Sequence, residues 1–266
     1  LGLLPVEEND NLAHIENIRQ LIEPSMDLDA LRRIANAAPP LAAEESEPEP
    51  VGEKVKIAVA RDEAFSFYYP ESLAVLERYG AQIVTFSPLN DAELPECDGI
   101  IFGGGFPEIF AARLAANEKM KESVRRAAAS GMPIYSECGG FMYLTREIKD
   151  FDGISHEMCG ILPVRCKMND KLNTVGYVSA DMLRDNCIAQ KGETLRGHEF
   201  HFSSAEIIEE ERGDTTEAFM LTKNRTGESR PSGCKKSSIL GSYLHLHFAG
   251  FPKAAERFVE QCRKRK

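Results

Sequence analysis

The sequence predicts an α/β fold in which a mostly parallel central sheet, flanked by helices, is followed by an antiparallel section. Three observations predict it. Short apolar runs alternate with helix-like segments between residues 55 and 144, glycine clusters directly follow two of these runs, and the later runs are shorter and closer together. Strands that alternate with helices form right-handed crossover units. The carboxyl ends of the parallel strands therefore meet at one edge of the sheet.

The segment 1–38 precedes this pattern and is predicted to contain two helices. An apolar opening, LGLLPV, is followed by helix-like segments near 12–21 and 28–36, and the second has Ser25 or Asp27 available as its N-cap. Two helices are too few to bury a core, and the chain begins with Leu rather than Met. We therefore expect a piece of a longer protein that starts with the C-terminal tail of a preceding domain.

A second domain is predicted over residues 55–266, after an extended linker at 39–54. The linker is rich in Pro, Ala and Glu, a composition that cannot bury apolar area. The polar stretch 223–236, rich in Gly, Ser and Arg, is predicted to be a mobile surface loop. Apolar patterning within the domain predicts strands at 55–60, 82–86, 99–102, 132–135, 161–167, 174–180, 194–202, 218–222 and 238–243, and helices at 71–79, 117–130 and 253–263.

The overall composition is that of an ordinary soluble globular protein, with 42% hydrophobic and 28% charged residues. A net charge of -10 argues against a general affinity for nucleic acid or anionic membranes. No apolar run has the length of a membrane-spanning helix, and the start lacks the pattern of a signal peptide. The seven cysteines have irregular spacing and no C-x-x-C pair, which favours reduced thiols. We therefore expect a cytoplasmic protein.

The stretch IYSECGGFMYL at 134–144 has the residue order of a reactive thiol held on a turn. Cys138 lies where a predicted strand ends and a helix-like pattern begins, and two glycines follow it. Glycines leave room for a sharp strand-to-helix turn and for backbone N–H groups near the sulfur. The positive partial charge at a helix N-terminus favours the thiolate. The alternative is a buried structural cysteine beside a tight turn.

A glycine-rich loop, GGGFPE at 103–108, follows the predicted strand at 99–102. Its backbone N–H groups could cradle a phosphate or stabilise an oxyanion. The loop lacks the Lys and the Ser or Thr of a P-loop, and its glycines are not spaced as in a dinucleotide-binding motif. These differences disfavour phosphate binding, and a plain turn between strand and helix remains the alternative.

Two pairs of histidines are candidates for a base that would serve a cysteine nucleophile. His245 and His247 alternate at the end of a predicted strand, where a period of two places both on one side. A thiol nucleophile needs an imidazole to take its proton, and distance in sequence is no obstacle. His198 and His201 form the second pair. No tight Cys or His ligand spacing occurs, so no metal site is predicted.

Four motifs, in this order, closely resemble the glutamine amidotransferase domain of the cobyrinic acid a,c-diamide synthase family. They are GGGFPE (103–108), SECGG (136–140), RGHEFH (196–201) and YLHLHF (243–248), and the resemblance runs from about Val55 to the C-terminus. It implies a class I glutamine amidotransferase-like fold. In that family the domain is the C-terminal half, behind an ATP-dependent synthetase domain of the dethiobiotin-synthetase type. The preceding domain expected from residues 1–38 would then be this synthetase.

The resemblance implies roles for three of the motifs. Cys138 would attack the side-chain amide of glutamine and His245 would activate it. The N–H groups of Gly104 or Gly105 and of Gly139 would form the oxyanion hole.

The sequence departs from the general class I pattern at two points. That pattern has Glu two residues after the histidine, where this sequence has His247, and a Gln shortly after the cysteine, where it has FMY. What fixes the tautomer of His245 is therefore left open. For His198 and His201 the resemblance allows a structural role or a position facing the ammonia channel or the corrinoid.

The implied activity is hydrolysis of glutamine, with ammonia passed to a synthetase site that amidates tetrapyrrole carboxylates. ATP and Mg²⁺ would serve the synthetase domain, and the 55–266 domain would bind no cofactor. Within the family, cobyric acid synthase is disfavoured because it usually shows Tyr-x-His-Gly, and the Ni-sirohydrochlorin a,c-diamide synthase stays open. A cysteine-based redox or chaperone-like protein on a related fold is the alternative from another class.

Overall fold

The structure is a computed structural model that describes residues 11–40 and 53–265. The chain divides into two compact units, Leu1–Pro48 and Glu49–Lys266, and each is described by itself. The apolar opening LGLLPV and most of the predicted linker at 39–54 lie outside the described residues. Among the helices described in the two units, none is long and apolar enough to cross a membrane.

The first unit contains the two predicted helices, α1 (Asn11–Ile22) and α2 (Leu28–Ala37), with a 3₁₀ turn, η1 (Glu23–Ser25), between them. Asp27 is the N-cap of α2, because its carboxylate accepts a hydrogen bond of 2.8 Å from the N–H of Ala30. Large apolar side chains are exposed on both helices, including Leu21 at 78%. The helices therefore have no core of their own.

The second unit alternates strands and helices as predicted and then continues in strands. Its elements are β1 (Val55–Ala60), α3 (Pro70–Arg78), β2 (Ala81–Phe86), β3 (Gly99–Phe102), α4 (Ala111–Ala116), α5 (Glu118–Ala129), β4 (Ile134–Glu137), α6 (Gly139–Leu144), β5 (Glu147–Lys149), β6 (Ser155–Glu157), β7 (Val164–Met168), β8 (Thr174–Met182), β9 (Thr194–His201), β10 (Ser203–Ile207), η2 (Glu209–Glu211), β11 (Thr216–Lys223), β12 (Ser229–Lys236), β13 (Ile239–Ser242), η3 (Phe248–Gly250) and α7 (Pro252–Arg265).

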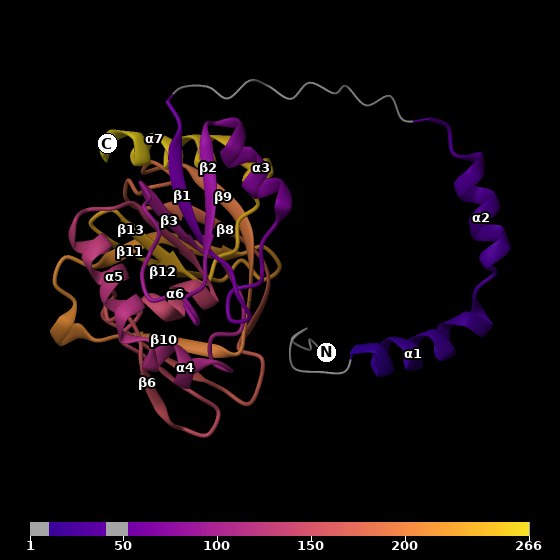
Figure 1. Ribbon diagram of the computed structural model, residues 1–266, viewed down its shortest axis with the longest axis horizontal. Helices are drawn as coiled ribbons and strands as arrows, with labels where there is room; N and C mark the ends of the chain where they lie inside the picture. Colours follow the sequence, from indigo (N-terminus) through magenta and orange to yellow (C-terminus); the bar gives the residue numbers. More distant parts are fainter. Residues whose placement is uncertain (1–10, 41–52, 266) are drawn as a thin grey trace. The chain divides into compact units, whose positions relative to one another are not determined.

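The large sheet has nine strands in the order β2-β1-β3-β4-β13-β12-β11-β8-β9 (Figure 1). The strands from β2 to β13 pair in parallel, and those from β13 to β9 pair antiparallel. The predicted α/β fold, with a parallel section followed by an antiparallel one, is confirmed. The strand predicted at 238–243 corresponds to β13, which joins both sections because it is parallel to β4 and antiparallel to β12.

The prediction of a mobile loop at 223–236 is wrong. Residues 229–236 form β12, an interior strand whose partners are β11 and β13. Its polar composition hid the strand, because Cys234 is its one fully buried side chain. The charged side chain of Arg230 is compatible with an interior strand because its guanidinium forms an ion pair of 2.7 Å with the carboxylate of Glu199 on β9.

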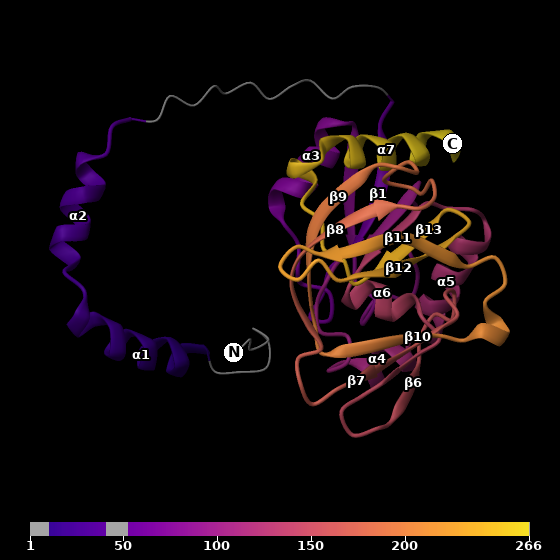
Figure 2. The same cartoon turned by 180° about the vertical axis from the view of Figure 1, so that it is seen from behind.

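Helices cover the two faces of the parallel section. Alternation along β1 sends Ala58 and Ala60 into a core with α4, α5 and α6, and Ile57 and Val59 into a second core with α3 and α7. Figure 1 shows α5 and α6 on the near side, and Figure 2, the view from behind, shows α7 crossing the sheet beside α3. A strand that is buried on both faces has a continuous run of apolar residues, and such runs are the pattern that predicts these strands from the sequence.

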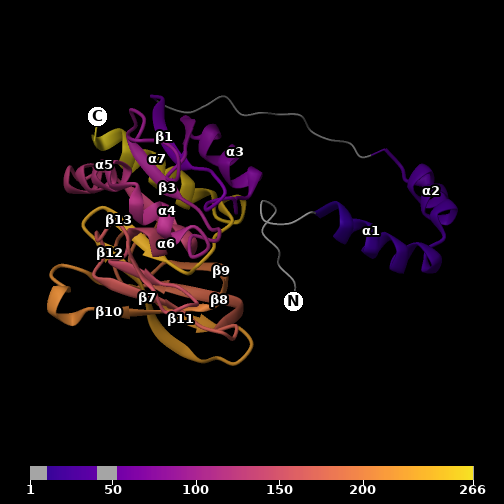
Figure 3. The same ribbon diagram turned by 60° about the horizontal axis from the view of Figure 1, so that its bottom comes forward.

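A second sheet of four short strands, in the order β10-β7-β5-β6, packs near α4 and α6. It lies in the lower half of the unit in Figure 3. The strand predicted at 161–167 belongs here as β7 and does not continue the main sheet. The strands β5 and β6 were not predicted, because three residues are too few for a periodic pattern.

The carboxyl ends of β3, β4 and β13 meet at one edge of the large sheet. In the register of the sheet, Phe102 pairs with Ser136, and Glu137 pairs with Ser242. The glycine loop follows β3, Cys138 follows β4, and the segment with His245 follows β13. The topology therefore brings three of the four sequence motifs together.

The N-cap of α5 offers a test of the fold. The side chain of Asn117 accepts from the N–H of Met120 and donates to the carbonyl oxygens of Pro88 (2.9 Å) and Asp91 (2.8 Å). Asn117→Ala removes a cap and two tertiary hydrogen bonds. We expect it to lower the free energy of unfolding by about 2 kcal/mol, measured by urea denaturation. Lys119→Ala, on the exposed face of α5, is the control, and equal effects of the two substitutions would contradict the assignment.

Candidate active site

Cys138 lies on a strained turn between β4 and α6. Its φ is 48° and its ψ is -105°, a backbone conformation that costs a non-glycine residue about 1–3 kcal/mol. The turn packs closely on β3, since a Cβ added to Gly140 would lie 2.4 Å from the carbonyl oxygen of Phe102. The CGG sequence is explained by this close approach. The thiol is nearly buried, at 8% exposure, with Sγ 3.8 Å from the carbonyl oxygen of Phe200 on β9.

His245 is buried beside Cys138. Its backbone forms a two-way bridge with His198 on β9, with N···O distances of 2.9 and 3.2 Å. Burial alone would lower the pKa of His245, but its interactions with the Cys138 side chain and with Glu137 raise it to about 10. A protonated imidazole at neutral pH is a positive charge beside the sulfur of Cys138. The structure therefore brings together the cysteine and the histidine that the sequence proposed.

Glu137 is a site residue that sequence reasoning missed. Its Oε2 lies 3.6 Å from Nδ1 of His245, while its Oε1 accepts hydrogen bonds from the hydroxyl of Tyr135 (2.6 Å) and the N–H of Leu246 (3.1 Å). The carboxylate is 9% exposed. The available signal was a charged residue at the end of a strand that is otherwise uncharged and buried.

His247 does not share the surroundings of His245. Its ring lies 4.6 Å from that of Tyr69, its Nε2 lies 3.9 Å from Glu71, and its side chain is 42% exposed. The period of two predicted both histidines on one side of a strand, but β13 already ends at Ser242. Beyond that residue the chain is no longer a regular strand, so the alternation does not apply.

The glycine loop lies against the turn at Cys138 and against the ring of His245. Gly103 accepts a hydrogen bond of 2.9 Å from the N–H of Gly140, and the backbone of Gly104 contacts the His245 ring, since an added Cβ would lie 2.7 Å from Cε1. A Cβ on Gly139 would lie 3.1 Å from the nitrogen of Gly105. Of the three glycines predicted for an oxyanion hole, Gly104 thus lies against His245, and Gly105 lies against Gly139, which directly follows Cys138.

The RGHEFH motif on β9 packs against His245. Gly197 lets β9 approach, because a Cβ there would lie 2.2 Å from the carbonyl oxygen of His245. The ring of His198 stacks on that of His245, with centroids 4.8 Å apart and an interplanar angle of 12°. Burial and the charge of His245 lower the pKa of His198, which favours its neutral form. Phe67 covers another side of the His245 ring, edge-on at 5.2 Å.

His201 is the other histidine of the RGHEFH motif, and it is buried. Its ring stacks on Tyr243 at 3.8 Å, and its Nδ1–H donates to the carbonyl oxygen of Ser203 at 2.7 Å. Burial lowers the pKa of His201 to about 4, so the ring is neutral. Its neighbour in the motif, Glu199, is 1% exposed and accepts both hydrogen bonds from Arg230. Within residues 11–40 and 53–265, no three His, Cys, Asp or Glu side chains group to hold a metal ion.

Comparison with known proteins decides the family. Residues 56–253 match the model of the CobB/CobQ-like glutamine amidotransferase domain. The chain belongs to this family. It is 39% identical to a cobyrinate a,c-diamide synthase of Caldanaerobacter subterraneus over 98% of this chain, and 42% identical to one of Dehalococcoides mccartyi over 97%. It spans 57% of the length of each. The resemblance stated from the four motifs is confirmed.

Among solved structures, the family's fold is shared with PurLQS from Thermotoga maritima. The two chains are 18% identical, and the TM-score is 0.56 over 79% of this chain and 98% of that one. At this identity the likeness shows the fold alone. It supports the prediction of a class I glutamine amidotransferase-like fold.

The protonated His245 leads us to expect a reactive thiol at Cys138. At pH 7 we expect iodoacetamide to alkylate Cys138 at least about 10-fold faster than Cys97, whose pKa burial raises to about 11. Peptide mass spectrometry over a time course measures both rates in one sample. His245→Asn should slow labelling of Cys138 and leave Cys97 unchanged, since Cys97 lies near Met132, away from the site. Equal rates at the two thiols of the unsubstituted chain would refute the interpretation.

Proposed function

We propose that the chain hydrolyses glutamine through a thioester on Cys138 and releases ammonia for an ATP-dependent ligase. The observation that carries the proposal is the strained, nearly buried Cys138 beside the buried His245, whose pKa is raised to about 10. A thiolate and an imidazolium held together supply a nucleophile and a general acid for the same amide. The family membership of the chain favours glutamine as the donor of that amide.

In the first half-reaction the Cys138 thiolate attacks the side-chain carbonyl carbon of glutamine. The C–S bond forms, and the carbonyl electron pair moves to the oxygen. When the tetrahedral intermediate collapses, the C–N bond breaks and His245 gives its proton to the departing nitrogen, so that ammonia leaves and a thioester remains. In the second half-reaction His245 takes a proton from water, which attacks the thioester. The C–S bond breaks as glutamate leaves, and the Cys138 thiolate and the His245 imidazolium are both regenerated, while the acid proton of the product passes to solvent.

The oxyanion of both tetrahedral intermediates needs backbone donors. We assign this role to the N–H groups of Gly104 or Gly105, which follow β3, and of Gly139, the first residue of α6. Their support is their proximity, since Gly105 lies against Gly139 and Gly104 lies against the His245 ring. Donors that are fixed before the reaction lower the barrier without reorganising during it.

The preceding part of the protein would carry the ligase. The chain spans 57% of relatives named cobyrinate a,c-diamide synthase, and the exposed apolar faces of α1 and α2 are what a domain tail would bury. Residues 1–38 would thus be the tail of a synthetase domain, 39–54 the linker and 55–266 the amidotransferase domain. The synthetase would use ATP and Mg²⁺ to activate tetrapyrrole carboxylates, with the a and c carboxylates of cobyrinate as the leading substrate. Ni-sirohydrochlorin and the substrate of cobyric acid synthase are the alternatives.

The glutaminase proposal is tested on the 266-residue chain. We expect hydrolysis of glutamine to glutamate, and Cys138→Ser should lower the rate on the order of 10³-fold or more, because the nucleophile is lost. Diazo-oxo-norleucine should add one label to Cys138, located by peptide mass spectrometry. Cys97→Ser is the matched control and should retain the activity. A chain that neither hydrolyses glutamine nor takes the label would favour the redox or chaperone-like alternative.

The ligase proposal needs the longer protein with its upstream domain. There, Cys138→Ala should abolish amidation with glutamine as the nitrogen donor and leave amidation with ammonium chloride within about twofold, since free ammonia bypasses the glutaminase site. Mass spectrometry of the tetrapyrrole products measures both. Offering cobyrinate and Ni-sirohydrochlorin in parallel identifies the substrate. Loss of both activities in the substituted protein would contradict the division of labour between domains.

A further inference from the structure

We propose that Glu137 is the positioning residue of this site, fixing the orientation and the protonated state of His245 in place of the acid that usually follows the histidine by two residues. The inference deepens the proposed function and rests on it. Glu137 precedes the nucleophile on β4, so a single strand end presents the carboxylate and the thiol to one imidazole.

The carboxylate is held by two donors that leave one oxygen for the histidine. The hydroxyl of Tyr135 and the N–H of Leu246 both donate to Oε1, at 2.6 and 3.1 Å, so Oε2 faces Nδ1 of His245 at 3.6 Å. That nitrogen is buried and has no hydrogen-bond partner in the described part of the chain. A separation of 3.6 Å is that of an ion pair, and catalytic hydrogen bonds in free enzymes are often long before substrate binds.

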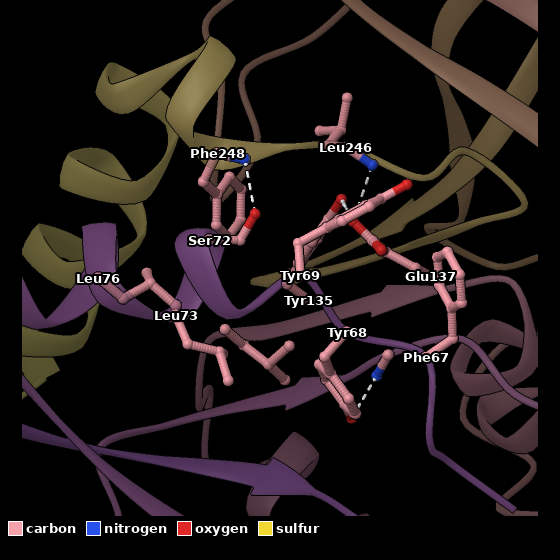
Figure 4. Close-up of a pocket in the computed structure, with 12 residues that line it drawn as sticks. Phe67, Tyr68, Tyr69, Ser72, Leu73, Leu76, Tyr135, Glu137, Leu246 and Phe248 are labelled. Atoms are coloured by element: carbon pink, nitrogen blue, oxygen red, sulfur yellow. Dashed lines mark hydrogen bonds between the residues drawn. The ribbon is translucent and has the colours of Figure 1, made fainter. Parts of the chain in front are cut away.

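The pocket beside Glu137 leaves His245 as the partner of its carboxylate. The carboxylate borders a largely apolar pocket, where Figure 4 shows it beside Tyr135 and Leu246 and facing the rings of Phe67 and Tyr69. None of the residues that line the pocket is Lys or Arg; they are Phe67, Tyr68, Tyr69, Ser72, Leu73, Leu76, Ile101, Gly103, Tyr135, Glu137, Leu246 and Phe248. With no Lys or Arg in the lining, the His245 imidazole, whose Nδ1 lies 3.6 Å from Oε2, is the side chain that can pair with this carboxylate as a cation.

The other titratable groups around His245 do not take this role. His198 stacks on its ring, and its lowered pKa favours the neutral form. Cys138 is the group that reacts. Glu199, on β9, is engaged by Arg230 at 2.7 Å. The imidazole of His247 lies beside Tyr69 and Glu71.

Glu137→Gln tests the proposal, because the amide oxygen can still accept from Tyr135 and Leu246 while the charge is lost. We expect kcat for glutamine hydrolysis to fall about 10²- to 10⁴-fold with KM changed less than about 3-fold. The alkaline limb of the kcat/KM profile should move to lower pH. The carboxylate raises the pKa of His245, so without it the imidazolium is lost at a lower pH.

Two further variants separate positioning from folding. Glu71→Gln removes an exposed carboxylate at the start of α3 and should leave both kcat and the pH profile within about twofold of the unsubstituted chain. Tyr135→Phe removes one donor to Oε1 without changing charge, and we expect an intermediate loss of about 10-fold in kcat. Thermal unfolding of each variant, followed by circular dichroism, shows whether the loss accompanies a loss of structure.

The outcomes are distinguishable from those of the glutaminase test. A folded Glu137→Gln with unchanged kcat and an unchanged alkaline limb overturns the role of Glu137, while the proposed function stands if Cys138→Ser is inactive. If Glu137→Gln does not fold, the decision passes to Tyr135→Phe. A pH profile and an NMR titration of His245 that are both unmoved in that variant overturn the proposal, and a shift of the His245 pKa supports it, since the lost donor acts on the imidazole through the carboxylate.

Discussion

The left-handed backbone at Cys138, with φ at 48°, is the constraint on which the rest of the site depends. It turns the chain from β4 into α6 within one residue, and this places the thiol at the edge of the sheet. The strain costs about 1–3 kcal/mol, so the packing around the turn must hold it. Two interactions do so: the N–H of Cys138 donates to the carbonyl oxygen of Ser242 at 2.7 Å, and that of Gly140 donates to Gly103 at 2.9 Å.

Those two hydrogen bonds also join the three strand ends that build the site. Ser242 ends β13, and Gly103 directly follows β3, so the turn after β4 is tied to a neighbour on each side. The antiparallel section then adds β9, whose Gly197 lies against the carbonyl group of His245. His245, which follows Cys138 by more than a hundred residues, is thus fixed by backbone contacts from two parts of one sheet. The side chains of Cys138 and His245 are therefore positioned by backbone hydrogen bonds and close contacts of the sheet.

The sequence was sufficient where one local rule decided the outcome. Alternating apolar runs placed β1, β3 and α5, and the CGG motif placed the turn at Cys138. Reasoning from the sequence failed where a distant partner decided. The strand β12 looks like a loop until Glu199, about thirty residues upstream, is seen to neutralise Arg230. Glu137 looks like an ordinary charge next to a cysteine until Tyr135, Leu246 and His245 are seen around its carboxylate. No local pattern contains such long-range compensation.

The position of Glu137 changes how the site is held together. A carboxylate placed after the histidine would have to fix its own chain segment and the imidazole at once. Here the carboxylate of Glu137 belongs to β4, which leads directly into Cys138. Through the N–H of Leu246 it also holds the segment that contains His245. One side chain therefore sets both the orientation of the His245 ring and the path of its backbone. His247 therefore does not have to hold the imidazole of His245, and its own side chain is 42% exposed at the position where the general class I pattern has Glu.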